Sequence, residues 1–309
     1  MIRYVIKRVL MLIPIILAIS FIVFTIMDFS PGDPVYAIVG DGMTQEQIEE
    51  FREAMGFNDP LLVRYGRYMW DVLHGDMGKS LYGEQDIFTN YMTRLPTTIY
   101  LAVVAMALTI VVAVPLGILA AVKQNTWIDS AASAFAVLGL SMPNFWLGLL
   151  LVILFSVNLG WLPSTGAESP KSIILPAIAC ALANMALIMR TTRSAMLDVI
   201  RQDYLRTARA KGVSERRVIL HHALRNALIP IVTMIGGQFT VLLGGAVVIE
   251  TVFAWPGIGY MIVTAIKGTD YTTVTSAVLL TTIFVAIVLL LVDILYAFID
   301  PRIKAQYSK

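Results

Sequence analysis

The sequence predicts an all-α polytopic membrane protein with six transmembrane helices, both termini in the cytoplasm, and a small helical extracytoplasmic insertion after the first helix. Hydrophobic residues make up 58% of the chain and charged residues only 14%, which is too few charges to cover the surface of a soluble protein of this length. Several windows exceed the ~18 apolar residues that a helix needs to cross a bilayer. Lys and Arg gather beside these windows in the pattern expected of cytoplasmic loops.

The first apolar run, residues 9–29, follows a basic flank formed by Arg3, Lys7 and Arg8. A cleaved signal peptide has a shorter apolar core and a small-x-small cleavage site, and this run has neither. We therefore expect residues 1–29 to form an N-terminal tail and a retained first transmembrane helix that starts in the cytoplasm.

Residues 30–97 differ from the rest of the chain in composition. They hold eleven Asp or Glu against five Lys or Arg, and they contain no apolar window long enough to span a bilayer. Placed after a helix that starts inside, this stretch lies outside and is predicted to be a small helical insertion. The insertion either fills space on the membrane helices or offers a contact surface for an extracytoplasmic partner, and both hypotheses stay open.

Two helices are predicted inside the insertion. The spacing of Thr44 and Gln47 is typical of a capping box, and a second helix start is predicted at Asp59 and Pro60. The apolar faces expected of these two helices are, respectively, Ile48, Phe51 and Met55, and Leu62, Tyr65, Met69 and Leu73.

Residues 98–309 are predicted to form the membrane core with the other five transmembrane helices. The apolar windows cover approximately residues 98–122, 130–158, 173–189, 228–252 and 275–298. The fifth predicted helix is rich in glycine, which on a membrane helix indicates close helix packing; a kink or gate is the alternative. These glycines are Gly236, Gly237, Gly244 and Gly245.

A basic loop, residues 197–227, connects the fourth and fifth predicted helices. Residues 190–225 carry nine Lys or Arg and three acids, so the loop is expected to face the cytoplasm. The chain from Tyr204 predicts a short helix, Gly212 can adopt the left-handed stop, and Ser214 can cap a second helix. A basic face beside anionic lipid headgroups would explain the charge. The small Ala208 and Ala210 beside the glycine break favour a docking element for another protein.

The stretch Arg206-Thr207-Ala208-Arg209-Ala210-Lys211-Gly212 resembles the cytoplasmic EAA loop of ABC-importer permeases, in the form used by the peptide-permease branch. Arg206 and Thr207 stand where the general motif has Glu and Ala, and Pro230 lies further downstream than its Leu-Pro. The resemblance extends over almost the whole chain through an ordered set of short motifs. These are Tyr4-Val5-Ile6-Lys7-Arg8, Pro31-Gly32-Asp33-Pro34, Gly75-Asp76-Met77-Gly78, Gly160-Trp161-Leu162-Pro163 and Trp255-Pro256-Gly257-Ile258-Gly259.

This resemblance implies a multi-pass permease subunit of the bacterial or archaeal plasma (inner) membrane that imports di- or oligopeptides by alternating access. It implies a second homologous permease, two cytoplasmic ATPase subunits that hold ATP and Mg²⁺, and an extracytoplasmic substrate-binding protein. Membrane lipid and the peptide substrate are the other expected partners, and nucleic acid is not one. Glutathione or a nickel chelate are alternative cargoes that similar permeases handle, and the sequence does not choose among them. The coupling helix would lie in residues 203–224, with Tyr204, Arg206, Thr207, Ala208, Ala210, Gly212, Ser214 and Glu215 as the ATPase-coupling residues.

Four residues are candidates for the transport pathway or its gate: Asn184, Gln238, Glu250 and Trp255. Asn184 and Gln238 either line a polar path or hydrogen-bond between helices. Glu250 could meet the amino group of an arriving peptide, cap a turn or face water. Asp293 is the deepest charge, and a structural ion pair with Arg190 or Arg193 is favoured over a proton or substrate site.

Enzyme chemistry is not expected in this chain. Gly78-Lys79-Ser80 is no phosphate-binding loop, because Leu73 stands where such a loop needs glycine. The three histidines lie outside the predicted transmembrane helices and form no zinc motif, and the single cysteine, Cys180, allows no intrachain disulfide. We expect no catalytic residue, no metal ligand and no cofactor here. A membrane-bound enzyme and a membrane receptor or scaffold with a docking loop are the two competing hypotheses.

Overall fold

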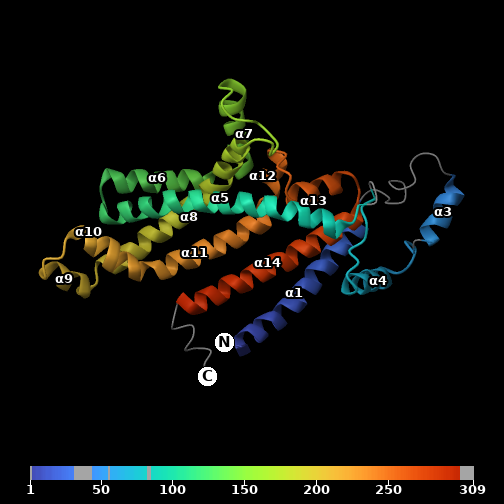
Figure 1. The fold of residues 1–309 in the computed structure, drawn as a ribbon, viewed down its shortest axis with the longest axis horizontal. Coiled ribbons are helices and arrows are strands. Elements are labelled where there is room, and N and C mark those ends of the chain that lie inside the picture. The colour runs from blue at the N-terminus through green and yellow to red at the C-terminus, as the bar shows by residue number, and fades with distance from the viewer. Residues whose placement is uncertain (1, 31–43, 55, 82–84, 300–309) are drawn as a thin grey trace. The chain divides into compact units, whose positions relative to one another are not determined.

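The computed structural model describes residues 2–30, 44–54, 56–81 and 85–299, and helices account for most of them (Figure 1). Within these residues there is no β-strand, only an isolated bridge between Lys79 and Asp86. The predicted all-α class is therefore confirmed. The orientation of the termini across the membrane stays a prediction.

Among the described residues, five helical stretches are long and apolar enough to cross a membrane. They are Val5–Asp28 in α1 (Ile2–Asp28), all of α5 (Ile87–Val122), Pro170–Ile200 in η3 (Pro170–Ile173) and α8 (Ile174–Ile200), Glu215–Gly244, and Tyr271–Tyr296 in α14 (Tyr271–Ile299). The stretch Glu215–Gly244 is built from α10 (Glu215–Arg217), the π-helical η4 (Val218–Ala223) and α11 (Leu224–Gly245).

The sixth candidate is broken. Helix α6 (Trp127–Ser141) is followed by α7 (Asn144–Leu151) and the π-helical η2 (Val152–Asn158), and the two halves meet at 100°. Pro143 forces the break: Met142 before it has ψ 123° and Pro143 itself ψ 135°, both extended, as the ring of a proline demands of the preceding residue. The predicted span over residues 130–158 is thus two helices with a sharp bend at Pro143.

The fourth and fifth predicted helices also differ in length from the observed ones. Helix α8 continues to Ile200, beyond the predicted end at 189, and the fifth helical stretch begins at Glu215 rather than at 228. Hydropathy finds only the apolar part of a helix, whereas the backbone hydrogen bonds continue into its polar end. Helix α11 ends at Gly245, and α12 (Val247–Val252) is separate.

The chain forms two compact units: residues 1–98 with 256–290, and residues 99–255 with 291–309. Helices α5 and α14 each contribute residues to both. Each unit is described by itself.

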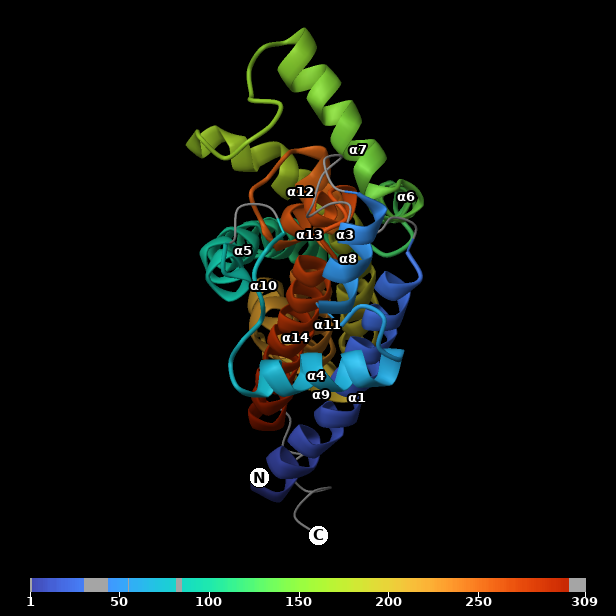
Figure 2. The same cartoon turned by 90° about the vertical axis from the view of Figure 1, so that its right-hand side faces the viewer.

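In the first unit, α4 (Leu61–Leu73) packs against α1 (Figure 2). The Tyr65 ring lies edge-on to Phe21, with 5.1 Å between the ring centroids, and its hydroxyl lies 2.8 Å from Ser20 Oγ. Leu62 and Leu73 are 69% and 76% exposed, so the predicted apolar face of α4 is wrong at both positions. Tyr65, which the prediction also placed on this face, does meet α1: its ring packs on Phe21, and the neighbouring Tyr68 ring packs on Phe24.

The predicted capping box is confirmed at the start of α3 (Gln45–Ala54). The Thr44 N–H donates to Gln47 Oε1 at 3.0 Å, and the Gln47 N–H donates to Thr44 Oγ1 at 3.4 Å. Ile48 is buried as expected. The Phe51 side chain and Met55 lie outside the described residues.

The Gly78-Lys79-Ser80 stretch has a structural role in the first unit. Ser80 Oγ donates to Asp270 Oδ2 at 2.6 Å and the Leu81 N–H to the same oxygen at 3.2 Å. Asp270 is 2% exposed and also caps α14 by accepting from the N–H and hydroxyl of Thr273. One carboxylate therefore ties the segment after α4 to the start of α14.

Replacing Asp270 with alanine is expected to lower the free energy of unfolding by about 2 kcal/mol, because several donors lose a charged acceptor. Hydrogen exchange at the Ser80 and Leu81 amides of the purified chain measures this local loss. Asp59→Ala is the control, since it removes only an exposed pair with Arg67, which is expected to contribute less than about 1 kcal/mol. Equal exchange in the two variants would contradict the proposed tie.

In the second unit, α8 packs against α6, α7, α11 and α12. Glycines allow the closest approaches: a Cβ on Gly117 would lie 2.7 Å from the carbonyl oxygen of Met189, and one on Gly236 would lie 2.2 Å from Tyr296 Oη. Close packing is thus confirmed for Gly236 in the glycine-rich helix, whereas Gly237 has no neighbour within 4 Å of an added Cβ.

A carboxylate that the sequence did not single out binds Arg193. Asp129 of α6 accepts from Arg193 Nε at 2.6 Å and from Arg193 Nη2 at 2.8 Å, and a third bond comes from the Asn125 N–H. Asp129 is 5% exposed. Arg193, one of the two arginines predicted as a partner of Asp293, thus pairs with Asp129.

Candidate coupling loop and pathway residues

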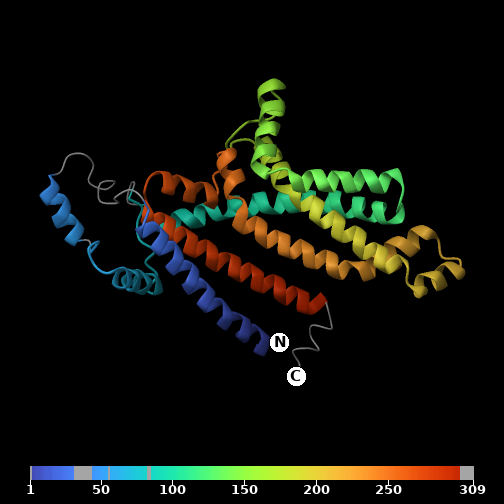
Figure 3. The same cartoon turned by 180° about the vertical axis from the view of Figure 1, so that it is seen from behind.

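The predicted loop lies where α8 ends and the α10–η4–α11 stretch begins (Figure 3). Helix α9 (Asp203–Ala210) follows the end of α8 at Ile200 after a two-residue turn. The second predicted loop helix is not separate: α10 continues through η4 into α11. Residues 215–245 therefore form one continuous helical stretch that begins in the loop.

One leucine anchors α9. Leu205 is completely buried and packs in an apolar cluster with residues from the end of α8 and from η4. Burying a leucine contributes about 1.5–3 kcal/mol, enough to hold so short a helix against its neighbours. The other buried members of this cluster are Ala121, Ala195, Met196, Val218, Ile219, Ala223, Ala227 and Ile231.

Gly212 ends α9 in the left-handed conformation that the sequence predicts, with φ of 76°. The Val213 N–H donates to the Ala208 oxygen at 3.2 Å, and the Gly212 N–H donates to the Arg209 oxygen at 2.9 Å. This pair of bonds is a Schellman motif, which satisfies carbonyls at a helix C-terminus. The turn is thus set by backbone geometry that glycine adopts without strain.

Ser214 stands at the N-terminal boundary of α10, and its carbonyl oxygen accepts from the Arg217 and Val218 N–H groups. Its side chain makes no capping hydrogen bond. The predicted cap is therefore correct in position and wrong in mechanism, because the backbone alone starts this helix.

An ion pair closes the turn. Glu215 accepts from Arg209 Nε at 3.0 Å and from Arg209 Nη2 at 2.8 Å, a two-bond geometry that is stronger than a single contact. The hydrogen bond to the carboxylate raises the pKa of Arg209 above its ordinary value, so the guanidinium stays charged at any physiological pH.

Reversing one charge of this pair is expected to loosen the turn, and reversing both to restore it. Arg209→Glu alone removes about 1 kcal/mol of stabilisation of the closed turn, which raises the equilibrium constant for local opening roughly fivefold. The double variant Arg209→Glu with Glu215→Arg recovers most of it. Hydrogen exchange at the Gly212 and Val213 amides provides the measurement. A double variant as open as the single one would show that the pair does not hold the turn.

The outward face of the loop carries most of the predicted coupling residues. Arg206, Thr207, Ala210, Gly212 and Ser214 are exposed. Ala208, in contrast, is half-buried against the Leu205 cluster, so only Ala210 of the two predicted alanines offers a small exposed side chain.

Tyr204 is exposed but held at its tip, since Asn226 Nδ2 donates to Tyr204 Oη at 2.7 Å. This bond joins α9 to α11. The sequence did not identify Asn226 or Leu205 as parts of the site. Leu205 is the one large aliphatic side chain in the short, charged helix α9, and this was the signal that could have found it.

The two candidate amides make local bonds. Asn184 on α8 is 7% exposed, and its Nδ2 donates to the Cys180 oxygen at 2.8 Å. Gln238 on α11 is half-buried and donates to Met234 Sδ at 3.7 Å. Each bond joins residues one helical turn apart, so these contacts link no two helices. The hypothesis of a polar path through these side chains stays a prediction.

Glu250 lies in α12, which packs on α7 and α8, and Trp255 follows three residues after the end of this helix. Glu250 is fully buried, which excludes the alternative in which it faces water, and Trp255 is 3% exposed. The backbone N–H of Trp255 donates to the backbone carbonyl oxygen of Glu250 at 2.8 Å. Between them, Phe253 packs against Gly148 of α7. The structure thus brings these two candidates together at a packed junction.

The sequence matches two parts of one protein family. Residues 113–305 match the family described as "Binding-protein-dependent transport system inner membrane component". Residues 1–102 match the one described as "Binding-prot-dependent transport system membrane comp, N-term".

Curated relatives are similar over almost their whole length. The chain is 42% identical over 304 residues to the glutathione transport system permease protein GsiC of Salmonella paratyphi A, covering 98% of this chain and 99% of the relative. It is 40% identical over 332 residues to the dipeptide transport system permease protein DppB of Alkalihalophilus pseudofirmus, covering 98% and 100%.

A solved structure has a similar fold. It is an inward-facing conformation of the MetNI methionine ABC transporter, with a TM-score of 0.58 and 20% sequence identity. The match covers 69% of this chain and 97% of that one. At this identity the likeness concerns the fold alone.

Proposed function

Because the chain belongs to the family of binding-protein-dependent transport system inner membrane components, we propose that it is a permease subunit of an ATP-driven importer of peptides. The observation that carries the proposal is the loop from α9 to α10. Its inner face is anchored by Leu205, its turn is set by Gly212, and its outer face is exposed. Such a loop suits a contact that receives force from another protein.

The anchoring gives a physical route for coupling. A push on α9 is expected to displace the cluster around Leu205, which includes Met196 at the end of α8 and Ile219 in η4. Packed cores transmit strain because their side chains have little free space. Movement of an ATPase subunit would therefore tilt α8 and the α10–η4–α11 stretch together. Opening of the path alternately to each side would follow from that tilt.

The proposed assembly contains a second related permease, two cytoplasmic ATPases that bind ATP and Mg²⁺, and an extracytoplasmic substrate-binding protein. ATP hydrolysis is assigned to those ATPases and not to this chain. In the motif that most resembles a phosphate loop, Gly78-Lys79-Ser80, the Ser80 hydroxyl donates to Asp270 instead. Support for this assignment comes from the family, whose description names a transport system component.

A short peptide is the proposed cargo. The relatives named above are transport permeases for glutathione and for dipeptides, and glutathione is itself a modified tripeptide. The shared chemistry is a small, flexible molecule that carries an ammonium group and at least one carboxylate. Glutathione and a nickel chelate remain the alternatives to an ordinary dipeptide.

The test begins with a gentle detergent purification of the tagged chain and mass spectrometry of the proteins that come with it. We expect a second permease and two ATP-binding subunits. The recovered complex, reconstituted into proteoliposomes with the binding protein, should then take up radiolabelled dipeptide only when ATP and Mg²⁺ are supplied to the ATPase side. A chain that purifies alone and supports no ATP-dependent uptake would favour a receptor or scaffold.

A further inference from the structure

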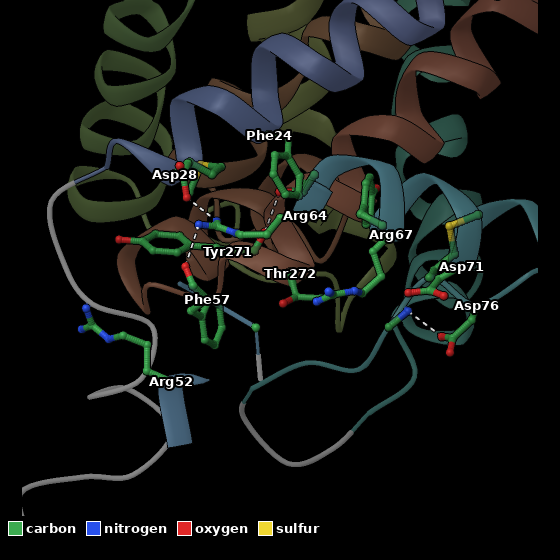
Figure 4. Close-up of a pocket in the computed structure, with 16 residues that line it drawn as sticks. Phe24, Asp28, Arg52, Phe57, Arg64, Arg67, Asp71, Asp76, Tyr271 and Thr272 are labelled. Carbon is green, nitrogen blue, oxygen red and sulfur yellow. Dashed lines mark hydrogen bonds and ion pairs between the residues drawn. The ribbon is translucent and has the colours of Figure 1, made fainter. Parts of the chain in front are cut away.

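The first unit contains a cavity of about 590 Å³ at α1, α4 and the start of α14 (Figure 4). Pockets that bind small molecules have volumes of about 300–1,000 Å³. None of the proposed coupling or pathway residues lines this cavity. Its lining therefore needs a separate explanation.

The lining carries charges of both signs in equal number. Three arginines and three aspartates surround the space, together with the aromatic rings of Phe24, Phe57, Tyr68 and Tyr271. A ligand with one net charge gains little from such a balanced set, whereas a zwitterion can pair with both signs. The six charged residues are Arg52, Arg64, Arg67, Asp28, Asp71 and Asp76.

Arg64 forms a fixed wall of the cavity. It pairs with Asp28, its Nη1 donates to the Phe57 carbonyl oxygen at 3.2 Å, and its guanidinium lies 5.9 Å from the ring centroids of both Phe24 and Phe57. Beside it, burial raises the pKa of the Tyr68 phenol to about 12, so this group is neutral near pH 7. This wall is preorganised, and its charge is already compensated.

Arg67 supplies an anion-binding group. Its Nη2 donates to Asp59 at 2.7 Å, and the side chain keeps 52% exposure, which leaves further donors of the guanidinium fork for a carboxylate. Figure 4 shows this guanidinium extending toward Thr272. Gly56 leaves room for it, because a Cβ there would lie 2.4 Å from Arg67 Nη1.

Asp71 and Asp76 supply a cation-binding group at the C-terminal end of α4, where Figure 4 shows them on the same side of the cavity. The Gly78 N–H donates to Asp76 Oδ1 at 2.8 Å and holds that carboxylate in place. Asp71 is exposed, and within the described residues its carboxylate has no hydrogen-bond or ion-pair partner. The partial negative charge of the helix end adds to the attraction for an ammonium group.

We propose that this cavity binds a short zwitterionic peptide, with the ammonium group at Asp71 and Asp76 and the carboxylate at Arg67. A side chain of the peptide would lie against Phe57 and Tyr271. The identity of the ligand as a peptide rests on the proposed function; the pairing of an ammonium site with a carboxylate site rests on the cavity. This would be a substrate subsite within the permease chain itself.

The experiment titrates the purified full-length chain, in nanodiscs of phosphatidylcholine, with the dipeptide Phe-Ala, its N-acetyl form and its C-terminal amide. We expect each blocked form to bind about tenfold more weakly than the free dipeptide, because one charged contact is lost. Asp71→Asn should weaken the free dipeptide by about the same factor and leave the N-acetyl form unchanged. Arg67→Gln should likewise weaken binding of the free dipeptide about tenfold and leave binding of the C-terminal amide unchanged.

Two charge-neutralising variants outside the cavity, Glu168→Gln and Lys171→Gln, serve as matched controls, since both side chains are exposed. They should bind the dipeptide like the unmodified chain. Both cavity variants alter exposed side chains on α4, and size-exclusion chromatography checks that they stay folded.

Three results would overturn the inference. The dipeptide could fail to bind at concentrations on the order of 1 mM; a dissociation constant of that size corresponds to a binding free energy near −4 kcal/mol. The cavity variants could bind it as tightly as the controls. Its binding could also vanish in nanodiscs that contain phosphatidylethanolamine, whose headgroup has the same ammonium and oxyanion; the site would then belong to lipid. ATP-dependent uptake by the unmodified complex is measured separately, so that uptake without cavity binding refutes only this inference.

Discussion

Replacing Gly212 with proline is expected to abolish ATP-dependent uptake while leaving the chain in the membrane at its normal level. Gly212 has φ of 76°, and proline is restricted to φ near −65°. Proline also lacks the N–H that donates to the Arg209 oxygen. The Schellman turn would open, and α9 would lose its fixed direction relative to α10. Uptake into proteoliposomes and the amount of chain in the membrane fraction are the two measurements.

Gly212→Asn is the matched control for the proline variant. Asparagine tolerates the left-handed conformation better than other residues with a side chain, and a Cβ at this position meets nothing within 4 Å. Uptake close to that of the unmodified complex is therefore expected. Normal uptake in the proline variant would instead mean that the loop transmits no force and is a basic turn facing lipid headgroups.

Replacing Gly117 with leucine is expected to destabilise the second unit by more than about 3 kcal/mol. Gly117 is buried on α5, where an added Cβ would lie 2.6 Å from Thr192 Cβ and 2.7 Å from the Met189 carbonyl oxygen. Both atoms belong to α8, and a backbone oxygen cannot move aside without distorting its helix. Thermal unfolding of the purified chain in detergent, followed by size-exclusion chromatography, measures the effect.

Gly237→Leu provides the corresponding control on another membrane helix. Gly237 is exposed on α11, and an added Cβ there has no neighbour within 4 Å. This variant gains the same helix propensity as Gly117→Leu without a clash. An unchanged unfolding temperature is expected, and an equal loss in both variants would show that the cause is not the contact between α5 and α8.

Several features could be predicted because they depend on neighbouring residues alone. The capping box of Thr44 and Gln47 needs only a spacing of three, and the left-handed turn at Gly212 needs only a glycine after a short helical run. The apolar windows that became membrane-length helices are equally local. In each case the hydrogen bonds or the hydropathy that decide the structure lie within one stretch of chain.

Other features depended on which helices meet. The sequence placed Leu62 and Leu73 on the inner face of α4 together with Tyr65, but only Tyr65 of these three meets α1. The rings of Phe21 and Phe24 on α1 pack against Tyr65 and Tyr68, and both leucines stay exposed. Hydrophobic periodicity describes one helix and contains no information on its partner.

The all-α membrane class, the approximate places of the long apolar helices and the helix–glycine–helix form of the loop all follow from the amino-acid sequence. Three contacts were found only in the folded chain: Asp129 binds Arg193, Leu205 anchors the loop, and charges from α1 and α4 surround a cavity together with the start of α14. Each of these contacts joins residues far apart in the chain. Their formation depends on the packing of whole helices, which no local pattern of residues specifies.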